Sequence, residues 1–142
     1  MTIARAITEV DALEVIRAGH TGRLGCIDNN EPYVVPINYL LDDGAIYSHS
    51  LPGKKTNAMR AHRRVCVQVD DVEGDFGWRS AIAFGDFEEI DQEYERQVFL
   101  TKLLSIFPKL TPVESTMAHD AAAPDSIVFR IVIDRVTGVE EE

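Results

Sequence analysis

The feature that most constrains the fold is a series of strand-length apolar segments joined by short turn sequences. RLGCI at residues 23–27 is followed by the turn sequence DNNEP at 28–32, and YVVPINYLL at 33–41 is followed by DDG at 42–44 and AIYSH at 45–49. Connections this short can join only antiparallel neighbours. The first half of the chain therefore predicts a three-stranded meander.

Three later segments have strand character as well. RVCVQVD at residues 64–70 has valine at every second position, and WRSAIAFGDFEEI at 78–90 and SIVFRIVIDRV at 126–136 complete the set. A period of two is typical of a strand buried on one face. In the second segment, Ala81, Ala83 and Gly85 share one face, where small residues would let a flat or bulky group approach the sheet.

Helices are predicted between these strands. Residues 9–18 follow Thr8, a suitable N-cap, and precede Gly19, a suitable stop. A short helix is expected over 56–62, and a longer one over 92–107 because its apolar residues recur at helical spacing before Pro108. Residues 108–125 have the composition of a loop.

These elements predict a mainly β (α+β) fold: six strands in a small closed antiparallel barrel, with two or three flanking helices. Hairpin connections favour a small barrel, because closing the sheet removes its edges. The chain has 142 residues, of which 45% are hydrophobic, enough for one core. We expect a single domain over residues 1–142.

Charge and composition narrow the class of partner. The formal net charge is −10, and such a field repels nucleic acid and anionic membrane surfaces. No run approaches the length of about 18 apolar residues that a spanning helix needs, and no leader pattern is visible, so we expect a cytoplasmic protein without membrane or nucleic-acid partners. Cys26 and Cys66 lie singly in apolar runs, which predicts reduced core thiols, and the four histidines show no metal-binding spacing.

One short segment departs from this acidic background. Five of the fourteen lysines and arginines lie between residues 54 and 64, with no acidic residue among them. The first two of them belong to HSLPGKKTN at 49–57, which offers the hydroxyl of Ser50, a flexible Gly53, the ammonium groups of Lys54 and Lys55, and the start of a helix. These groups can bind a phosphate. The spacing is not that of a Walker A loop, and a solvated loop remains an alternative.

Pro36 interrupts the segment at 33–41. Proline has no N–H to donate to a strand ladder, so the interruption indicates either an edge strand or a bulge. A bulge would leave backbone groups of Ile37, Asn38 and Tyr39 available to a ligand. The sequence pattern leaves both alternatives open.

Taken together, these motifs resemble those of a known family. PYVVPINYLLDDGAIYSHSLPGKKTNAM, followed by VCVQVD and WRSAIAFGDFEEI, resembles the pyridoxamine 5′-phosphate oxidase-like, FMN-binding split-barrel superfamily, and most closely its nitroimidazole-resistance branch. The resemblance covers about residues 21–90 and extends weakly into the last strand. It implies that the barrel is a six-stranded antiparallel split β-barrel.

The resemblance implies FMN as the cofactor, with its phosphate held by Ser50 and Lys55, and homodimers with a flavin at the subunit interface. It implies that the backbone of residues 36–39 lies along the flavin ring. The full set of residues that it places near the cofactor is Pro36, Ile37, Asn38, Tyr39, His49, Ser50, Lys54, Lys55, Asn57 and Ser80.

Two functions follow from the resemblance. The first is an FMN-dependent oxidoreductase that reduces a small nitro compound or quinone with electrons from NADH or NADPH; no side chain need act as acid or base. The second is a protein that stores or senses flavin or heme without turnover, and a deazaflavin or heme could replace FMN. Vitamin B6 oxidation is not expected, because the basic residues for its phosphate are missing and Gly138 is followed by Val139 rather than lysine.

Overall fold

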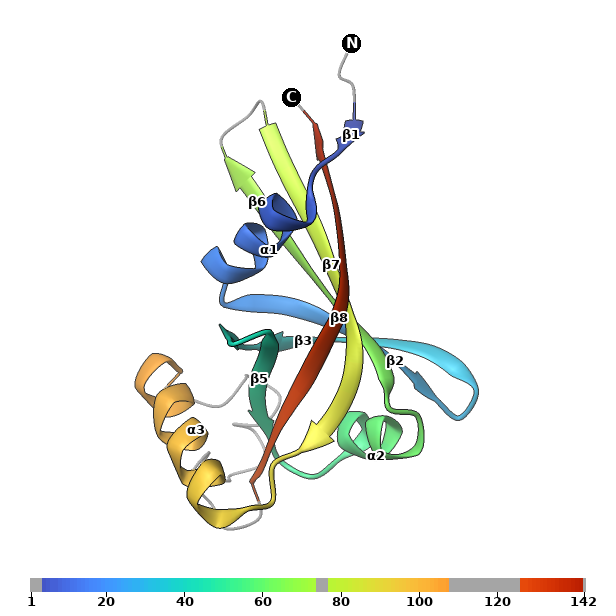
Figure 1. Ribbon diagram of the computed structural model, residues 1–142. Coiled ribbons are helices and arrows are strands. Elements are labelled where there is room, and N and C mark those ends of the chain that lie inside the picture. Colours follow the sequence, from blue (N-terminus) through green and yellow to red (C-terminus); the bar gives the residue numbers. More distant parts are fainter. Residues whose placement is uncertain (1–3, 74–76, 108–125, 142) are drawn as a thin grey trace.

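The computed structural model describes residues 4–73, 77–107 and 126–141, which form eight strands and three helices (Figure 1). The strands are β1 (Ala4–Ala6), β2 (Thr21–Asp28), β3 (Glu31–Asn38), β4 (Leu40–Asp42), β5 (Ala45–Ser50), β6 (Arg64–Glu73), β7 (Gly77–Glu89) and β8 (Ile127–Glu141). The helices are α1 (Glu9–Ala18), α2 (Lys54–Ala61) and α3 (Glu93–Ile106).

All strands belong to one antiparallel sheet with the order β3-β2-β6-β7-β8-β5-β4, and β1 pairs with the far end of β8. The two end strands of this path, β3 and β4, are consecutive in the chain and are joined by Tyr39 alone. The sheet therefore curls into a barrel. Its two end strands are connected covalently through Tyr39, but no hydrogen-bonded ladder joins them. The predicted class, an antiparallel split barrel with flanking helices, is confirmed.

The strand number differs from the expected six for two reasons. β1 is only three residues long, too short to show a pattern in the sequence. The segment predicted as one strand over 33–41 divides at Tyr39, whose N–H donates to the carbonyl of His20 at 2.9 Å instead of joining a ladder. Beyond this residue the chain pairs with β5, and Leu40 lies opposite Tyr47.

Both predicted hairpin turns in the first half are present. Asn29 and Asn30 have φ values of 50° and 67°, and Asp43 and Gly44 have values of 47° and 75°. Two consecutive residues with positive φ define the type I′ turn, whose twist matches that of paired strands. Both hairpins therefore follow from local turn chemistry. The predicted three-stranded meander was wrong, because the segment over 33–41 divides at Tyr39 and its two parts, β3 and β4, lie at opposite ends of the strand path.

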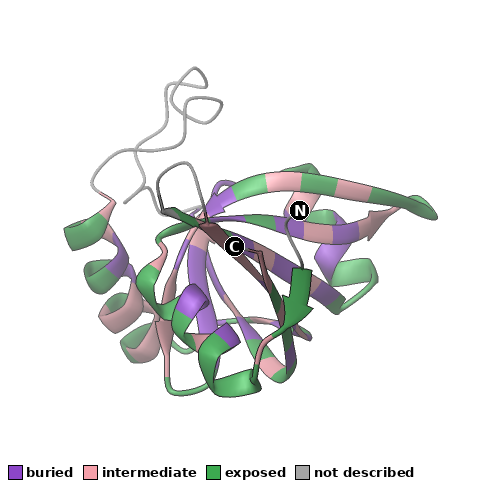
Figure 2. Ribbon diagram, turned by 90° about the horizontal axis from the view of Figure 1, so that it is seen from above, coloured by how far each residue is buried: buried purple, intermediate pink, exposed green. Residues whose placement is uncertain are grey.

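The inner face of the barrel forms the main core, and α1 contributes to it. Figure 2 shows buried residues running along the strands and exposed residues on the outward turns of the helices. Ala81 and Ala83 are fully buried in the same cluster as Ala12 and Ile16 of α1. The row of small residues on β7 is therefore part of the core that includes α1, rather than a surface open to a ligand.

Helix boundaries agree closely with the sequence pattern. The first helix spans the predicted residues, and the Thr8 hydroxyl accepts from the N–H of Asp11 at 3.1 Å. The second helix begins at Lys54, two residues before the predicted start, and the third begins after Gln92, which caps it. The loop predicted over 108–125 lies outside the described residues. None of the described helices is long and apolar enough to cross a membrane.

Candidate anion site and the edge of the barrel

The start of α2 is open to an anion. Its N-cap is Gly53, which has no side chain to cap the first turn, and a Cβ placed there would meet nothing within 4 Å. The Thr56 hydroxyl accepts from the N–H of Gly53 at 3.0 Å, which closes the turn before the helix. The first N–H groups of a helix lack intrahelical partners and carry partial positive charge. We name Ser50, Gly53, Lys54, Lys55 and this first turn the candidate anion site.

The two lysines at this site differ in their surroundings. The Lys54 ammonium lies 3.5 Å from the Asp28 carboxylate and 4.6 Å from the centre of the Tyr33 ring, so it connects α2 to the β2–β3 hairpin. Lys55 is half-buried, and Asn57 is exposed one turn into the helix. Neither Asp28 nor Tyr33 was singled out from the sequence, because a turn aspartate and a strand tyrosine carry no motif.

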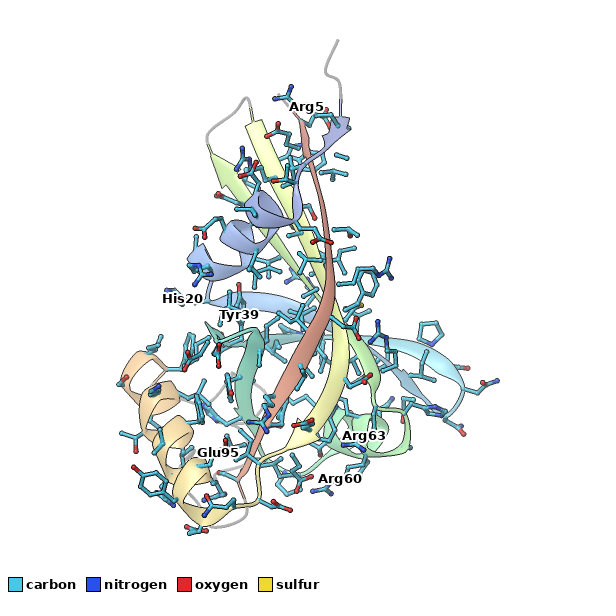
Figure 3. The ribbon with its side chains drawn as sticks, in the orientation of Figure 1. Arg5, His20, Tyr39, Arg60, Arg63 and Glu95 are labelled. Atoms are coloured by element: carbon cyan, nitrogen blue, oxygen red, sulfur yellow. The ribbon has the colours of Figure 1, made fainter. Side chains whose placement is uncertain are left out.

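The three arginines of the basic segment have structural partners. Arg60 lies 2.7 Å from Glu89, Arg63 donates to the carbonyl of Phe87, and Arg64 pairs with Asp134. Figure 3 shows Arg60 and Arg63 beside α2. These contacts fasten the helix and the start of β6 to β7 and β8. The lysine end of the segment forms the first turn of α2, at the candidate anion site.

Ser50 and His49 come from the end of β5. Ser50 is buried, and its hydroxyl donates to the carbonyl of Leu51 at 2.8 Å. His49 is half-buried and lies opposite Val128 in the ladder with β8. The neighbouring Ser48 donates its hydroxyl to the carbonyl of Asn38 at 2.6 Å. This bond ties β5 to β3, so the candidate anion site and the Pro36 segment border the same split in the barrel.

The Pro36 segment is an edge strand and contains no bulge. Pro36 pairs with Arg23, and the register runs without interruption to Asn38, which pairs with Thr21. β3 lies at the end of the strand path, so the missing N–H of Pro36 disrupts no second ladder. The bulge alternative was therefore wrong, and the edge-strand alternative was right.

The groups expected to become available at a bulge are partly bonded within the protein. The Asn38 carbonyl accepts from Ser48, and its side-chain oxygen accepts from the Thr21 hydroxyl at 3.1 Å. Ile37 is buried in the main core, so its side chain faces away from the edge. A ligand along this segment would therefore meet the outer edge of β3 and the exposed ring of Pro36.

Tyr39 has a structural role. Its side chain is fully buried, and its hydroxyl donates to the carbonyl of Ile16 at 2.5 Å, which fastens α1 to the strand junction (Figure 3). Burial raises the pKa of Tyr39 well above its usual range. Neither its hydroxyl nor its backbone N–H is directed to the candidate anion site.

Ionisation of Tyr39 gives a prediction about alkaline stability. The pKa of Tyr39 in the folded state lies above its unfolded value of about 10. The stabilising contribution of Tyr39 to the free energy of unfolding is therefore fully present below pH 10 and is lost as the pH rises above 10. Tyr39→Phe should cost about 1–3 kcal/mol at pH 7, because the Ile16 carbonyl loses the shorter of its two hydrogen bonds and keeps that from the Gly19 N–H at 3.3 Å. That difference should shrink by about 1.4 kcal/mol per pH unit above pH 10. Denaturant unfolding of the wild type and Tyr39→Phe at pH 7–11 measures this difference in stability. A difference that stays constant over this range would contradict the raised pKa of Tyr39.

Ser80 lies apart from the other predicted site residues. Ser50 pairs with Ile127 of β8, near the Glu89 end of β7, whereas Ser80 lies nine residues away along β7, about 30 Å at the rise of a strand. The Ser80 hydroxyl accepts from Gln68 at 2.8 Å on the outer face of the sheet. One chain thus leaves Ser80 on a different face from the candidate anion site, and it buries the side chains of Ile37 and Tyr39 in the main core.

No three side chains of histidine, cysteine, aspartate or glutamate in the described ranges come together as a metal site. The described groups around the split are a helix start with no side-chain cap and two lysines at one end, and the outer edge of β3 at the other. This arrangement suits a ligand that has an anionic end and an extended planar part.

The antiparallel barrel, split between β3 and β4, places this chain in the split-barrel class of proteins. The chain belongs to the pyridoxamine 5′-phosphate oxidase family, whose model matches residues 8–140. The superfamily recognised from the sequence is confirmed.

Individual relatives agree with this assignment. A FAD-binding protein from Mesorhizobium loti is 32% identical, with a TM-score of 0.82, and the match covers 100% of this chain and 99% of that one. An uncharacterized protein of Rhizobium meliloti is 27% identical over 94% of this chain and 93% of its own length. A Bacteroides thetaiotaomicron structure described as a candidate 5-nitroimidazole antibiotic resistance protein shares the fold, with 20% identity, a TM-score of 0.79, and coverage of 99% of this chain and 89% of that one.

Proposed function

We propose that this chain binds FMN, with the phosphate at the candidate anion site and the ring along the edge of β3. The observation that carries the proposal is the start of α2, which has no side-chain cap and two lysines in its first turn. A phosphate monoester carries about −1.5 to −2 charges, which two ammonium groups and a helix terminus can balance locally. The Ser48–Asn38 bond keeps this site next to β3.

The residues present fit such a ligand. Lys54, Lys55 and the first-turn N–H groups would hold the phosphate, and the Ser50 hydroxyl would exchange the Leu51 carbonyl for a phosphate oxygen. Pro36 and Asn38 would lie along the ring. When bound, the flavin would supply electron and hydride transfer, and the protein would supply position and electrostatics.

We further propose that the protein is an oxidoreductase. It would reduce a small organic substrate of the nitro-compound or quinone type with electrons from NADH or NADPH, in the cytoplasm where both donors are abundant. The fold shared with the Bacteroides structure is compatible with this substrate class. The Mesorhizobium relative is described as FAD-binding, so FAD is the second candidate cofactor.

The position of Ser80 favours a homodimer. Ser80 shares the outer face of the sheet with Val72, Ile82, Phe84 and Val139, apolar residues that belong to neither buried cluster. Val72 is 69% exposed and Val139 40% exposed. A second copy covering this face would bury these side chains and could bring Ser80 to the flavin of its partner.

Ile82→Asp tests the dimer. The substitution places a charge in the centre of the proposed interface, so the protein should sediment as a monomer where the wild type sediments as a dimer. Val10→Asp is the matched control, because Val10 is 72% exposed on α1, away from this face. A monomeric wild type, or a dimer unaffected by Ile82→Asp, would contradict the proposal.

The visible absorption spectrum of the purified protein tests the cofactor. A flavin spectrum, with FMN identified by chromatography after heat release, would support the proposal, and bleaching by NADH or NADPH under anaerobic conditions would support an oxidoreductase. FAD in the supernatant would favour the second candidate. A heme spectrum, or a colourless protein that takes up no added flavin, would overturn the flavin proposal. A bound flavin that neither donor reduces would favour storage or sensing.

A further inference from the structure

The candidate anion site contains a carboxylate to which the sequence motif assigns no role. Asp28 lies 3.5 Å from the Lys54 ammonium, which also sits 4.6 Å from the centre of the Tyr33 ring. Asp28 and Tyr33 belong to the β2–β3 hairpin, whereas Lys54 begins α2. The ammonium group therefore already has an anionic partner and an aromatic partner within the protein.

The hairpin fixes both partners in place. Asp28 pairs with Glu31 across the type I′ turn of Asn29 and Asn30, and Tyr33 pairs with Cys26 two residue pairs further along the ladder. The Asp28 carboxylate is attached to an ordered backbone position beside α2. A phosphate that approaches the first turn of α2 must compete with it for Lys54.

We infer that Asp28 is an affinity-determining residue of this site: its carboxylate competes with the phosphate of the ligand for Lys54. The inference rests on the proposed function, because it names a residue that regulates the same site. Lys55 and the first turn of α2 provide the primary contacts, and Lys54 contributes only after it leaves Asp28. The competing pair is partly exposed, with side-chain exposures of 60% and 30%, so its effect is moderate and depends on salt.

Asp28→Asn is the direct test. It removes the competing charge but retains the size of the side chain, so FMN should bind about two- to fivefold more tightly at low ionic strength, with a smaller gain at high salt. Asp43→Asn is the matched control, because it removes the same charge from the exposed turn before β5. Unchanged or weaker binding by Asp28→Asn, relative to this control, would overturn the inference.

Two further measurements make the test specific. In a Lys54→Met background, Asp28→Asn should no longer tighten binding; a gain of equal size there would show that Asp28 does not act through Lys54. Inorganic phosphate should raise the melting temperature of Asp28→Asn more than that of Asp43→Asn, a readout that needs no flavin. If the wild type bound no FMN, the proposed function would fail. The rise in melting temperature with inorganic phosphate, compared between Asp28→Asn and Asp43→Asn, would then be the remaining test of the inference. Equal shifts, or none, would overturn it.

Discussion

Lys55→Ala is expected to weaken FMN binding by about 10- to 100-fold, or about 1.4–2.8 kcal/mol. This magnitude is typical for the loss of a charge-assisted hydrogen bond to a phosphate. Lys55 lies in the first turn of α2 at the candidate anion site, next to Lys54, whose ammonium lies 3.5 Å from the Asp28 carboxylate. Titration of the apoprotein with FMN, followed by quenching of flavin fluorescence, measures the change.

Arg60→Ala is the control for Lys55→Ala. It removes the same charge from the same helix, but Arg60 is paired with Glu89 at 2.7 Å. Its effect on FMN affinity should therefore be small, and Ser50→Ala should fall between the two. If Lys55→Ala and Arg60→Ala weakened binding equally, the helix would attract FMN only through its overall charge. An unchanged affinity in Lys55→Ala would place the phosphate elsewhere.

Gly85→Ala is expected to have the largest effect on folding. A Cβ at this position would lie 2.2 Å from the carbonyl oxygen of Val132, at the irregularity in the β7–β8 register. The added Cβ would be bonded directly to the backbone of β7, and the oxygen belongs to the backbone of β8. Neither can move aside while the two strands stay paired, so the strands would have to separate. We expect a loss of about 3 kcal/mol or more in the free energy of unfolding.

Gly77→Ala is the control for Gly85→Ala. Its Cβ would come no closer than 3.8 Å to the carbonyl oxygen of Glu141, an ordinary contact, so its effect should be below about 1 kcal/mol. Urea unfolding of the three proteins measures both changes. A Gly85→Ala protein as stable as the wild type would mean that β7 and β8 do not approach this closely in solution.

The sequence alone determined the features that depend on residues close together in the chain. The Asn29–Asn30 and Asp43–Gly44 turns, the first helix with its Thr8 cap, and the alternation in β6 were all predicted, because each requires only neighbouring side chains and backbone angles. The two lysines after Gly53 could be found for the same reason, although the helix begins two residues before the predicted start.

Contacts between distant segments required the tertiary structure. Whether Pro36 marked a bulge or an edge depended on the place of β3 at the end of the strand path. The small residues of β7 proved to lie in the core shared with α1, and Arg60 and Arg64 of the basic segment pair with carboxylates on β7 and β8. Neither set of contacts can be predicted from a short stretch of sequence, because strand order and register bring together residues that are far apart in the chain.

The candidate site shows the same division. The HSLPGKKTN motif pointed to the lysines from their spacing alone, but the pairing of Lys54 with Asp28 depends on where the β2–β3 hairpin lies beside α2. The distance of Ser80 from the start of α2 likewise follows from the length of β7 and its position in the barrel. Local spacing determined which chemical groups this protein offers, and the curvature and register of one sheet decided which of them lie together.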